Sequence, residues 1–483
     1  MRCFFSACAV LACLWAADAA PEEALNIGTR LEPFLDRFLI DRLEGAALEM
    51  QSPTEAGVAL RFDAPWEGRY CGYVTVFKDA EKFRLYYRGL PEPNKDGSDT
   101  EVTCYAESAD GIAWTKPSLG LHEVNGTREN NVILAGMAPY SHNFAPLYDT
   151  RNGVPAEERY KALAGTSETG LAAFVSPDGV NWRILQKGVI TEGAFDSQNV
   201  AFWSEAEGKY VCYFRTWSEG PFAGYRWISR TVSDDFLNWT KPEEMGNGGA
   251  PLEHIYINQT TPYFRAPHIY IALAARFMPE RTVVSDAEAA ALGIQGDYGK
   301  DCSDGVLMTS RGGTRYDRTF MEGFIRPGVG VENWTSRSNY PACGIIPTGK
   351  NEMSFFVQHN YGQPAANLVR HTLRLDGFTA VTAGYAGGEM TTKPLRFEGD
   401  TLFLNFATSA AGSVRVEMED ADGNVLPGYG MEDSMELIGN FISRPVAWKS
   451  GKTLGDLAGK TVRARFLMKD SSLFSIRFGQ AGE

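Results

Sequence analysis

Three acidic residues stand just before short apolar runs that are typical of β-strands. They are Asp196, Glu253 and Glu67. Two carboxyl groups that face each other across a glycosidic bond, one protonated and one ionised, can hydrolyse that bond. We therefore take these three residues as candidate catalytic groups, with acid and base roles open among them and Asp36. The alternative for each is a carboxylate in a surface ion pair, and Asp41 is a weaker candidate.

Three arginines end the second strand-like run of a unit, namely Arg88, Arg215 and Arg276. A guanidinium group pairs bidentately with carboxylate or sulfate. The arginines therefore predict an anionic ligand, such as a uronic or sulfated sugar. The alternative is that they neutralise the candidate carboxylates and leave a site for a neutral sugar.

Amide side chains recur at one position, just before the first strand-like run of a unit. Asparagine both donates and accepts hydrogen bonds, as a hydroxyl-rich ligand requires, although any single one could simply cap a turn. Aromatic residues near these positions could stack on a sugar ring. Besides the arginines, the predicted substrate-binding residues are His142, Asn143, Gln198, Asn199, Asn258, Arg337, Asn339 and His359, and the candidate stacking residues are Trp66, Trp217, Tyr256 and Tyr361.

A recurring hairpin must position these residues. Residues 108–114, Ser-Ala-Asp-Gly-Ile-Ala-Trp, return in related form at 176–182 and 233–239, and in altered form at 310–316. The aspartate caps the turn, and glycine tolerates a positive φ. Recurrence at intervals of roughly 55 to 80 residues favours the four-stranded blades of a β-propeller. Four unrelated hairpins in a β-rich protein are the alternative.

Five units of strand-like runs predict an all-β fold, a five-bladed β-propeller over residues 30–385. We expect residues 34–41 to close the ring by pairing with the last blade, and residues 378–381 to end that blade. The first strand of each blade begins at the face to which the loop between its second and third strands returns. The polar residues should therefore converge on an axial funnel, with Asp301 and Asp304 at its mouth. Alternating runs predict a C-terminal β-sandwich over residues 389–480.

Composition and cysteine usage limit the partners. The 483-residue chain has a net charge of −14, which argues against nucleic acid and anionic membranes. Its cysteines beyond residue 19 are widely spaced and lie in apolar runs, which favours buried thiols. The zinc-binding patterns C-x-x-C and H-E-x-x-H are absent, so the sequence predicts neither a metal nor another cofactor. The sequence leaves the oligomeric state open.

Residues 1–19 have the pattern of an export signal. Arg2 precedes an apolar run over residues 4–16, and Ala17-Asp-Ala19 is a small-x-small cleavage site. We expect a secreted or periplasmic protein without a transmembrane segment. Residues 10–13 weakly match a lipoprotein box, so a lipid anchor on Cys13 is the alternative.

The hairpins, the five units and the trailing sandwich resemble the five-bladed propeller glycoside hydrolases, with families 32 and 43 nearest in layout. The segment 233–239 carries the resemblance most clearly. By position, the resemblance implies that Glu67 or Asp36 is the nucleophile or base, that Asp196 orients the substrate and that Glu253 is the acid. The chain lacks the Trp-Met-Asn-Asp-Pro-Asn, Arg-Asp-Pro and Glu-Cys motifs of family 32, which leaves these roles and the sugar open. Sialidases share the hairpins but use six blades and a tyrosine nucleophile.

The combined prediction is an exported glycoside hydrolase with paired carboxylates in an axial funnel. Two other classes of protein remain possible at this point. A non-catalytic carbohydrate-binding propeller would keep the arginine and asparagine rim but hold its carboxylates too far apart for hydrolysis. A scaffold protein would have a shallow apolar face and no polar funnel.

Overall fold

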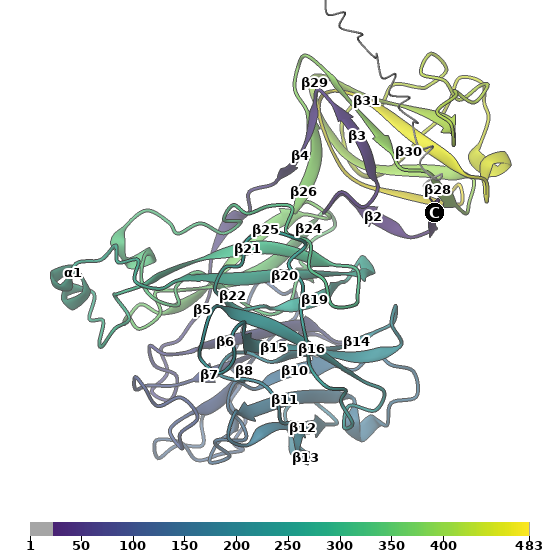
Figure 1. Cartoon of the computed structure of the whole chain (residues 1–483). Helices are drawn as coiled ribbons and strands as arrows, with labels where there is room; N and C mark the ends of the chain where they lie inside the picture. Colours follow the sequence, from purple (N-terminus) through teal and green to yellow (C-terminus); the bar gives the residue numbers. More distant parts are fainter. Residues whose placement is uncertain (1–22, 483) are drawn as a thin grey trace, which may run out of the picture.

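A computed structural model describes residues 23–482 as two β-rich bodies joined side by side, a propeller and a sandwich (Figure 1). The predicted export signal, residues 1–19, lies outside the described residues. No helix within residues 23–482 is long and apolar enough to span a membrane. The described α-helix, α1 (Asp286–Ala291), lies in an insertion of the propeller.

Five blade sheets form the propeller, which confirms the predicted fold. Blade I contains β6 (Gly72–Lys78), β7 (Phe83–Gly89), β8 (Val102–Ser108) and β9 (Val132–Leu134). Blade II contains β10 (Ala145–Tyr148), β11 (Tyr160–Thr166), β12 (Gly170–Ser176) and β13 (Arg183–Ile190). Blade III contains β14 (Val200–Ser204), β15 (Lys209–Trp217), β16 (Arg226–Ser233) and β17 (Glu243–Glu244). Blade IV contains β18 (Ile255–Ile257), β19 (Thr260–Tyr263), β20 (Ala266–Met278) and β21 (Cys302–Ser310).

Blade V shows how the ring closes. It contains β22 (Tyr340–Pro341), β23 (Ile346–Pro347), β24 (Glu352–His359) and β25 (Asn367–Arg374), and its outer strand is the N-terminal β5 (Thr54–Arg61). Contacts of β6 with β10 and with β23 complete the circle on either side of blade I. An N-terminal strand therefore closes the ring, but the prediction that residues 34–41 do so is wrong. Phe34, Leu39 and Ile40 are buried in the core of the sandwich instead.

The sandwich contains strands from both ends of the chain. Its ten strands are β1 (Leu25–Gly28), β2 (Leu31–Pro33), β3 (Ile40–Glu44), β4 (Ala46–Met50), β26 (Thr379–Ala383), β27 (Gly388–Thr392), β28 (Leu395–Phe397), β29 (Thr401–Asp420), β30 (Asn440–Pro445) and β31 (Val462–Gly479). The strand predicted at 378–381 to end blade V is β26, which pairs with β4 and β31. The C-terminal sandwich is confirmed, and it also includes the N-terminal residues 25–50.

A buried ionic cluster joins the sandwich to blade IV. Arg311, just after β21, reaches Glu32 with Nη1 at 2.9 Å and Asp36 with Nε at 3.0 Å. His268 Nε2 lies 3.0 Å from Glu32 Oε1. Because Glu32 is fully buried, its charge depends on these partners. The cluster therefore holds the two bodies in one orientation.

The recurring hairpins have the turn chemistry that their sequence predicts. The hydroxyl oxygen of Ser108 accepts the backbone N–H of Gly111 at 2.9 Å, and the same bond recurs in the second and third copies. The fourth residue of every copy has a positive φ, from 62° to 75°. In the third copy this residue is Phe236, whose buried ring packs on Tyr210 and Trp239. Core packing there outweighs the backbone strain that glycine avoids.

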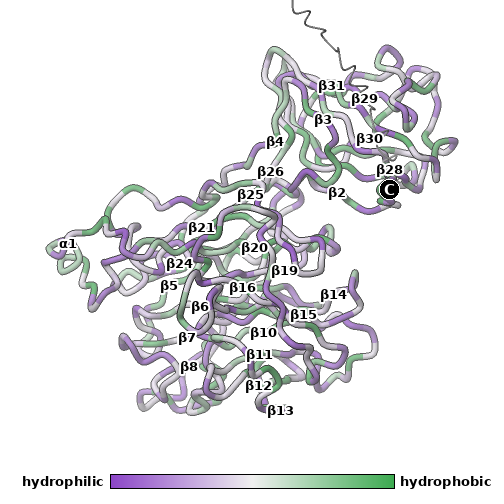
Figure 2. The backbone as a smooth tube through the Cα atoms, in the orientation of Figure 1, coloured by the Kyte–Doolittle hydropathy of each residue, from purple (hydrophilic) through white to green (hydrophobic). Residues whose placement is uncertain are grey.

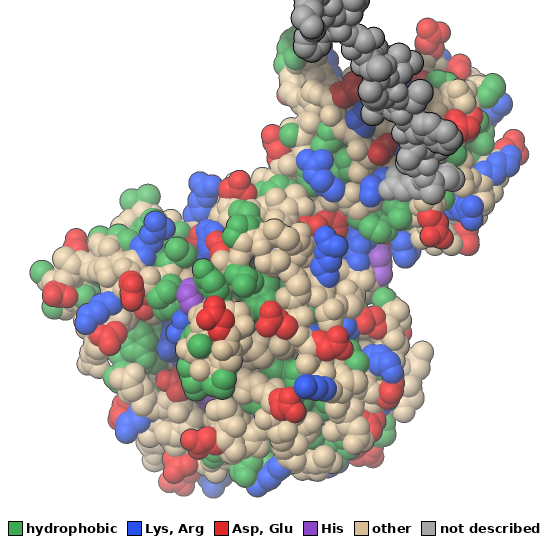
Figure 3. All heavy atoms as spheres, in the orientation of Figure 1, with side chains coloured by type: hydrophobic (Ala, Val, Ile, Leu, Met, Phe, Trp, Pro, Cys, Tyr) green, Lys and Arg blue, Asp and Glu red, His purple; other side chains and the backbone are tan. Residues whose placement is uncertain are grey.

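Apolar residues lie mainly along the strands, and polar residues lie mainly in the loops (Figure 2). The face seen in Figure 3 carries acidic and basic side chains that are interspersed. A net negative charge thus coexists with local groups of basic residues, one of which lies at the propeller axis.

Candidate active site at the propeller axis

Strained residues mark the places where the inner strands begin. Tyr73, Asn143, Phe195, Gln259 and Arg337, one from each blade, have positive φ values between 48° and 57°. Such backbone conformations are costly for non-glycine residues and tend to occur at functional sites. The five sharp turns carry the polar segments toward the axis, as the propeller geometry predicts.

A chain of amides crosses the axis. Gln198 Nε2 donates to Thr75 Oγ1 at 2.5 Å, and Gln198 Oε1 accepts from Gln259 Nε2 at 2.6 Å. Gln259 Nε2 also donates to the carbonyl oxygen of Pro341 at 2.9 Å. The chain links blades I, III, IV and V across the axis. Gln198, a predicted substrate ligand, uses both ends of its amide in this chain.

Three arginines surround Tyr256, the middle residue of β18. The guanidinium carbon of Arg215 lies 4.0 Å from the ring centroid, that of Arg337 lies 5.4 Å away and that of Arg226 lies 5.7 Å away. Arg215 and Tyr256 are almost fully buried. The phenol of Tyr256 has a lowered pKa, because the charges of Arg337 and Arg215 outweigh the opposing effect of burial.

A fourth arginine extends the cluster toward blade I. The Arg88 guanidinium lies 4.7 Å from the ring centroid of Tyr73. Arg88 Nη2 and Arg337 Nη1 each donate to the hydroxyl of Tyr361 at 3.1 Å. The structure thus brings three predicted substrate-binding residues, Arg88, Arg215 and Arg337, to this cluster.

Three aspartates accompany these arginines, and their surroundings differ. Asp96 Oδ1 lies 2.5 Å from Arg88 Nη1, and Asp196 Oδ2 lies 2.7 Å from Arg215 Nη1. The charge of Arg88 outweighs burial and lowers the pKa of Asp96. Burial instead raises the pKa of Asp301 to about 6, although Ser336, Arg337 and Arg226 oppose this shift. The arginine cluster is therefore accompanied both by a carboxyl group that can be protonated near neutral pH and by carboxylates that are paired with arginine.

A cavity of about 250 Å³ opens among these side chains. Several buried polar atoms at the axis have no hydrogen-bond partner among the described residues, which leaves them free to bind a ligand or water. They include both amide atoms of Asn199, Asn143 Oδ1, Tyr340 Oη, Asp301 Oδ1, and Nε of Arg215 and Arg226. The residues that line the cavity are Asn94, Arg226, Tyr256, Phe277, Gly296, Asp297, Tyr298, Asp301, Ser336 and Arg337.

Glu67, a predicted catalytic residue, lies inside blade I. Its Oε1 accepts the hydroxyl of Tyr87 at 2.5 Å, and its Oε2 accepts the N–H of Ala64 and the ammonium of Lys116, both at 2.8 Å. The residue is fully buried. Because all its contacts are with blade I and its flanking loops, Glu67 is a structural carboxylate rather than a group facing Asp196.

Glu253 and Arg276 form a second ionic network, away from Tyr256. Arg276 binds Glu253 at 2.8 Å and Asp304 at 2.6 Å, and Arg318 also binds Glu253. These residues border a separate hollow of about 500 Å³, which includes Trp334. The prediction that Arg276 shares the funnel with Arg215 is therefore wrong. A register shift between Ile255 and Ile257 interrupts the inner edge of blade IV, and such bulges redirect side chains.

Of the other predicted substrate-binding residues, some lie at the axis and others have structural contacts within the blades. Asn258 Oδ1 caps the N–H of Thr260 at 3.0 Å, and Asn339 Nδ2 donates to the carbonyl oxygen of Ser303 at 3.2 Å, so both have structural contacts. His142 lies between two partners, with Nδ1 at 2.8 Å from Glu101 and Nε2 at 2.9 Å from Asn143. His359 packs against His371, with ring centroids 6.0 Å apart.

The predictions missed Arg226, Tyr298 and Asp96 as residues of the site. The sequence analysis searched for polar residues at the starts of the inner strands and at the ends of the second strands. The third strand of a blade also begins at this face of the propeller. A search that included the starts of the third strands would have found Arg226, which begins β16. Asp96 and Tyr298 come from loops, in which strand periodicity gives no signal.

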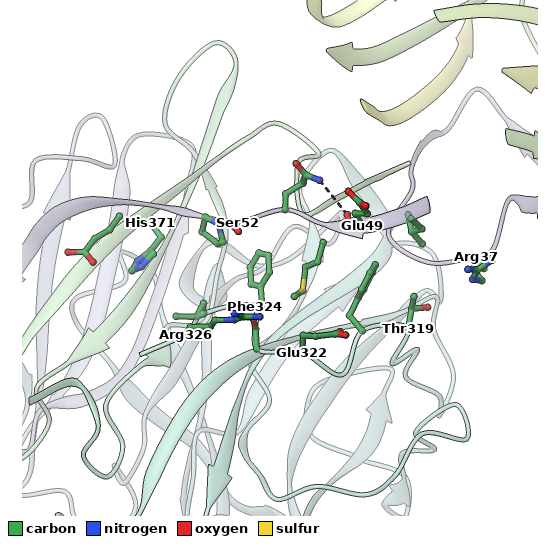
Figure 4. Close-up of a pocket in the computed structure, with 16 residues that line it drawn as sticks. Arg37, Glu49, Ser52, Thr319, Glu322, Phe324, Arg326 and His371 are labelled. Atoms are coloured by element: carbon green, nitrogen blue, oxygen red, sulfur yellow. Dashed lines mark hydrogen bonds between the residues drawn. The ribbon is translucent and has the colours of Figure 1, made fainter. Parts of the chain in front are cut away.

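A larger hollow, with a volume of about 800 Å³, lies elsewhere. It lies between residues 48–55, which connect the sandwich to β5, and the loop 319–326 (Figure 4). Glu49 and Glu322 on its walls are exposed to solvent. Since Arg88, Arg215 and many of the unpartnered polar atoms lie at the axis, size alone does not make this hollow the reactive site.

No protein-family model and no curated protein sequence matches the chain. Among solved structures, the chain is similar to a glycoside hydrolase, at 12% identity over 67% of this chain and 92% of that one, with a TM-score of 0.44. It is similar to an N-acetylgalactosamine deacetylase from F. plautii, at 12% identity over 68% and 97%, with a TM-score of 0.45. It is also similar to a β-1,2-mannobiose phosphorylase from Listeria innocua, at 11% identity over 68% and 98%, with a TM-score of 0.42. These likenesses are distant, so the chemistry of the axial site rests on its own residues.

Proposed function

We propose that the protein is a glycoside hydrolase that cleaves an acidic glycan at the propeller axis. The observation that carries the proposal is the contrast between Asp301, whose pKa is raised to about 6, and Asp196, which is paired with Arg215. A glycosidase needs one carboxyl group that donates a proton and another that is ionised.

In this proposal each group has a defined part in the reaction. Asp301 donates its proton to the glycosidic oxygen as the bond to the sugar breaks. Asp196 is the ionised partner that activates water or attacks the sugar, and its exposed side chain is accessible to either. Tyr256 and Phe277 supply aromatic walls for the sugar ring. These roles replace the assignment of Glu67 and Glu253 as catalytic residues.

The arginines favour a substrate with a carboxylate or sulfate group. Arg215, Arg226 and Arg337 surround one tyrosine, and two of them retain an unpartnered Nε atom. Arginine recognises planar anions through paired, charge-assisted hydrogen bonds. A uronic acid or a sulfated sugar therefore fits the site better than a neutral one.

A non-catalytic carbohydrate-binding propeller is the second candidate. Two of the three expected catalytic carboxylates, Glu67 and Glu253, lie away from the axis, which favours this candidate. Such a protein would bind the acidic sugar through the arginines and would release no product.

A panel of acidic and neutral polysaccharides, with detection of released reducing ends, distinguishes the two candidates. We expect release from at least one uronate-containing or sulfated glycan, and loss of that release in Asp301→Asn. The matched control is Glu322→Gln, which changes an exposed carboxylate of the hollow in Figure 4. Binding of an acidic glycan without release by the native chain would favour the binding protein, and neither binding nor release would reject both functions.

We also propose that the protein acts outside the cytoplasm, on the basis of the signal-like residues 1–19. Expression of the full chain in a bacterial host, followed by mass spectrometry of the protein from periplasm and medium, tests this proposal. A mature N-terminus near residue 20 is the expected result, and an uncleaved cytoplasmic chain would contradict it.

A further inference from the structure

The hollow of about 500 Å³ beside Glu253 is separate from the axial cavity. Phe277 of β20 lines the axial cavity, whereas its neighbours Arg276 and Met278 border the hollow. Successive side chains of a strand point to opposite faces of its sheet. The end of β20 therefore separates the two spaces, and no described residue borders both of them.

Two of the carboxylates that border the hollow are already paired with arginine. Arg276 holds Asp304 through two contacts, Nε to Oδ1 at 2.9 Å and Nη2 to Oδ2 at 2.6 Å. Glu253 accepts Arg276 Nη1 on Oε1 at 2.8 Å and Arg318 Nη2 on Oε2. All four carboxylate oxygens thus have an arginine partner, and two arginines balance two carboxylates. This network has no net charge with which to neutralise another arginine.

Two further arginines border the hollow and form no ion pair with residues 23–482. Arg281 belongs to the insertion between β20 and β21, and Arg326 follows β21. Burial raises the pKa of the Cys302 thiol and the charge of Arg281 opposes this shift, which places the guanidinium near the thiol. Arg326 Nε donates to the carbonyl oxygen of Gly323 at 3.5 Å, which is long for such a bond. Both arginines are exposed, so their charges are available to a ligand.

Trp334 adds an aromatic face to the border of the hollow. Its Nε1 donates to the carbonyl oxygen of Gly328 at 3.2 Å, and the preceding Asn333 donates from Nδ2 to the carbonyl oxygen of Val329 at 2.8 Å. These bonds hold the turn that carries the indole. An indole ring stacks on the apolar face of a sugar, and the exposed carboxylate of Glu322 on the same border can accept sugar hydroxyl groups.

The charge balance of the hollow favours an anionic sugar. Outside the paired network, its border carries the two arginines and one carboxylate, that of Glu322. Guanidinium groups bind carboxylate and sulfate through paired, charge-assisted hydrogen bonds. The volume lies within the range of about 300 to 1,000 Å³ that is usual for ligand pockets. An inorganic anion would use the arginines and leave the indole of Trp334 without a partner.

We propose that this hollow is a second binding site for an acidic glycan. Arg281 and Arg326 hold a carboxylate or sulfate group, and Trp334 stacks on the sugar ring. The site goes beyond the proposed function, because it binds the glycan whether or not the axial residues hydrolyse it. Exposed charges interact weakly, so a single sugar binds here with low affinity. A polymer that contacts the hollow at several sugars in turn, or the hollow and the axis together, binds more tightly.

Native electrophoresis in gels that contain polygalacturonate, chondroitin sulfate or dextran tests the site, with the Kd taken from mobility against polymer concentration. The starting protein is Asp301→Asn, so that binding is measured without turnover. We expect retardation by at least one acidic polymer and none by dextran. Arg281→Gln with Arg326→Gln should raise the Kd by about tenfold. The matched control is Arg183→Gln with Arg396→Gln, which removes the same charge from exposed positions of blade II and the sandwich.

Arg215→Ala in the same protein separates the hollow from the axis. It should leave a residual retardation that Arg281→Gln with Arg326→Gln abolishes. If Arg215→Ala does not fold, the comparison in Asp301→Asn alone still decides the proposal. Equal retardation of the test pair and the control pair would overturn the second site and leave the axial proposal standing. Retardation by neither acidic polymer, or equal retardation by dextran, would also overturn it.

Trp334→Ala distinguishes a sugar from a bare anion. We expect this change to raise the Kd for the acidic polysaccharide by about three- to tenfold, and Trp334→Phe to restore most of the loss, because phenylalanine keeps an aromatic face. Poly-glutamate carries carboxylates without sugar rings, so its retardation should be weaker and unchanged in Trp334→Ala. Equal retardation by poly-glutamate, with no effect of Trp334→Ala on either polymer, would mean that the hollow binds acidic polypeptides and would overturn the assignment to a glycan.

Discussion

Arg215 lies against Tyr256, with its guanidinium 4.0 Å from the ring centroid and its Nη2 atom 2.7 Å from the carbonyl oxygen of the same residue. This contact joins blade III to blade IV at the axis. The phenols of Tyr73 and Tyr340 have raised pKa values because they are buried, whereas that of Tyr256 is lowered by Arg337 and Arg215. A positive potential is therefore concentrated at Tyr256, which lines the cavity together with Arg226 and Asp301.

Arg215→Ala should weaken binding of an acidic sugar by about 1.5 to 3 kcal/mol, the range for a hydrogen bond to a charged group. Arg215→Lys should restore only part of this affinity, because an ammonium group lacks the planar fork. Calorimetric titration with glucuronate tests both variants. Arg276→Ala is the matched control, since Arg276 belongs to the Glu253 and Asp304 network, and an equal loss in this variant would contradict the axial site.

Asp301→Asn should change the pH dependence of stability. The folded pKa of Asp301 is about 6 and its ordinary value is 3.8, so the folded state holds this proton more tightly than the unfolded state. The stabilisation from the bound proton is present below about pH 4 and is lost as the pH rises to about 6. Because asparagine cannot ionise, the variant should gain about 2 to 3 kcal/mol over the native chain between these pH values. Urea denaturation across this range measures the difference, and parallel curves for the two proteins would show that Asp301 has no raised pKa.

Arg311→Ala should lower the free energy of unfolding by about 3 to 5 kcal/mol, because Glu32 is left buried without its main cation and Asp36 also loses its partner. The exposed pair of Arg42 with Glu44 provides the control, and Arg42→Ala should change stability by less than about 1 kcal/mol. Differential scanning calorimetry would show whether the sandwich and the propeller then unfold separately. Equal effects of the two substitutions would mean that the cluster does not hold the bodies together.

Glu67→Gln separates the structural interpretation of this residue from the catalytic one. Loss of the charge that binds Lys116 should destabilise the fold by about 1.5 to 3 kcal/mol. The kcat/KM of the folded variant should stay within about twofold of the native value, since the residue does not reach the axis. A stable variant that loses about 100-fold or more in kcat would return Glu67 to the catalytic residues.

The hairpins made the fold predictable, because a Ser-x-Asp turn has a local sequence pattern, which recurs in blades I, II and III and in altered form in blade IV. The closing strand was not predictable in the same way. Residues 34–41 are apolar and could belong to a blade, whereas β5 is exposed along most of its length and has a weak hydrophobic pattern. Only the register with β25 shows that β5 is the outer strand of blade V.

Site residues were predictable where strands position them and not where loops do. Arg215, Arg337 and Asn199 reach the axis because the blade geometry brings strand ends there. Glu67 and Glu253 could not be excluded from sequence, since their partners Lys116 and Arg318 are 49 and 65 residues away along the chain. Asp301 was expected only at the mouth of the funnel, and its raised pKa depends on burial that the sequence does not show.

The pH dependence of kcat/KM for the native chain and for Asp301→Asn, on an acidic glycan that the panel identifies, tests the central claim most directly. We expect the native activity to fall as the pH rises through about 6, because Asp301 must carry its proton to protonate the glycosidic oxygen. We expect Asp301→Asn to lose about 100- to 10,000-fold in kcat while it still binds the glycan. A variant that keeps native activity with the same pH profile would contradict the account and place the reaction elsewhere on the molecule.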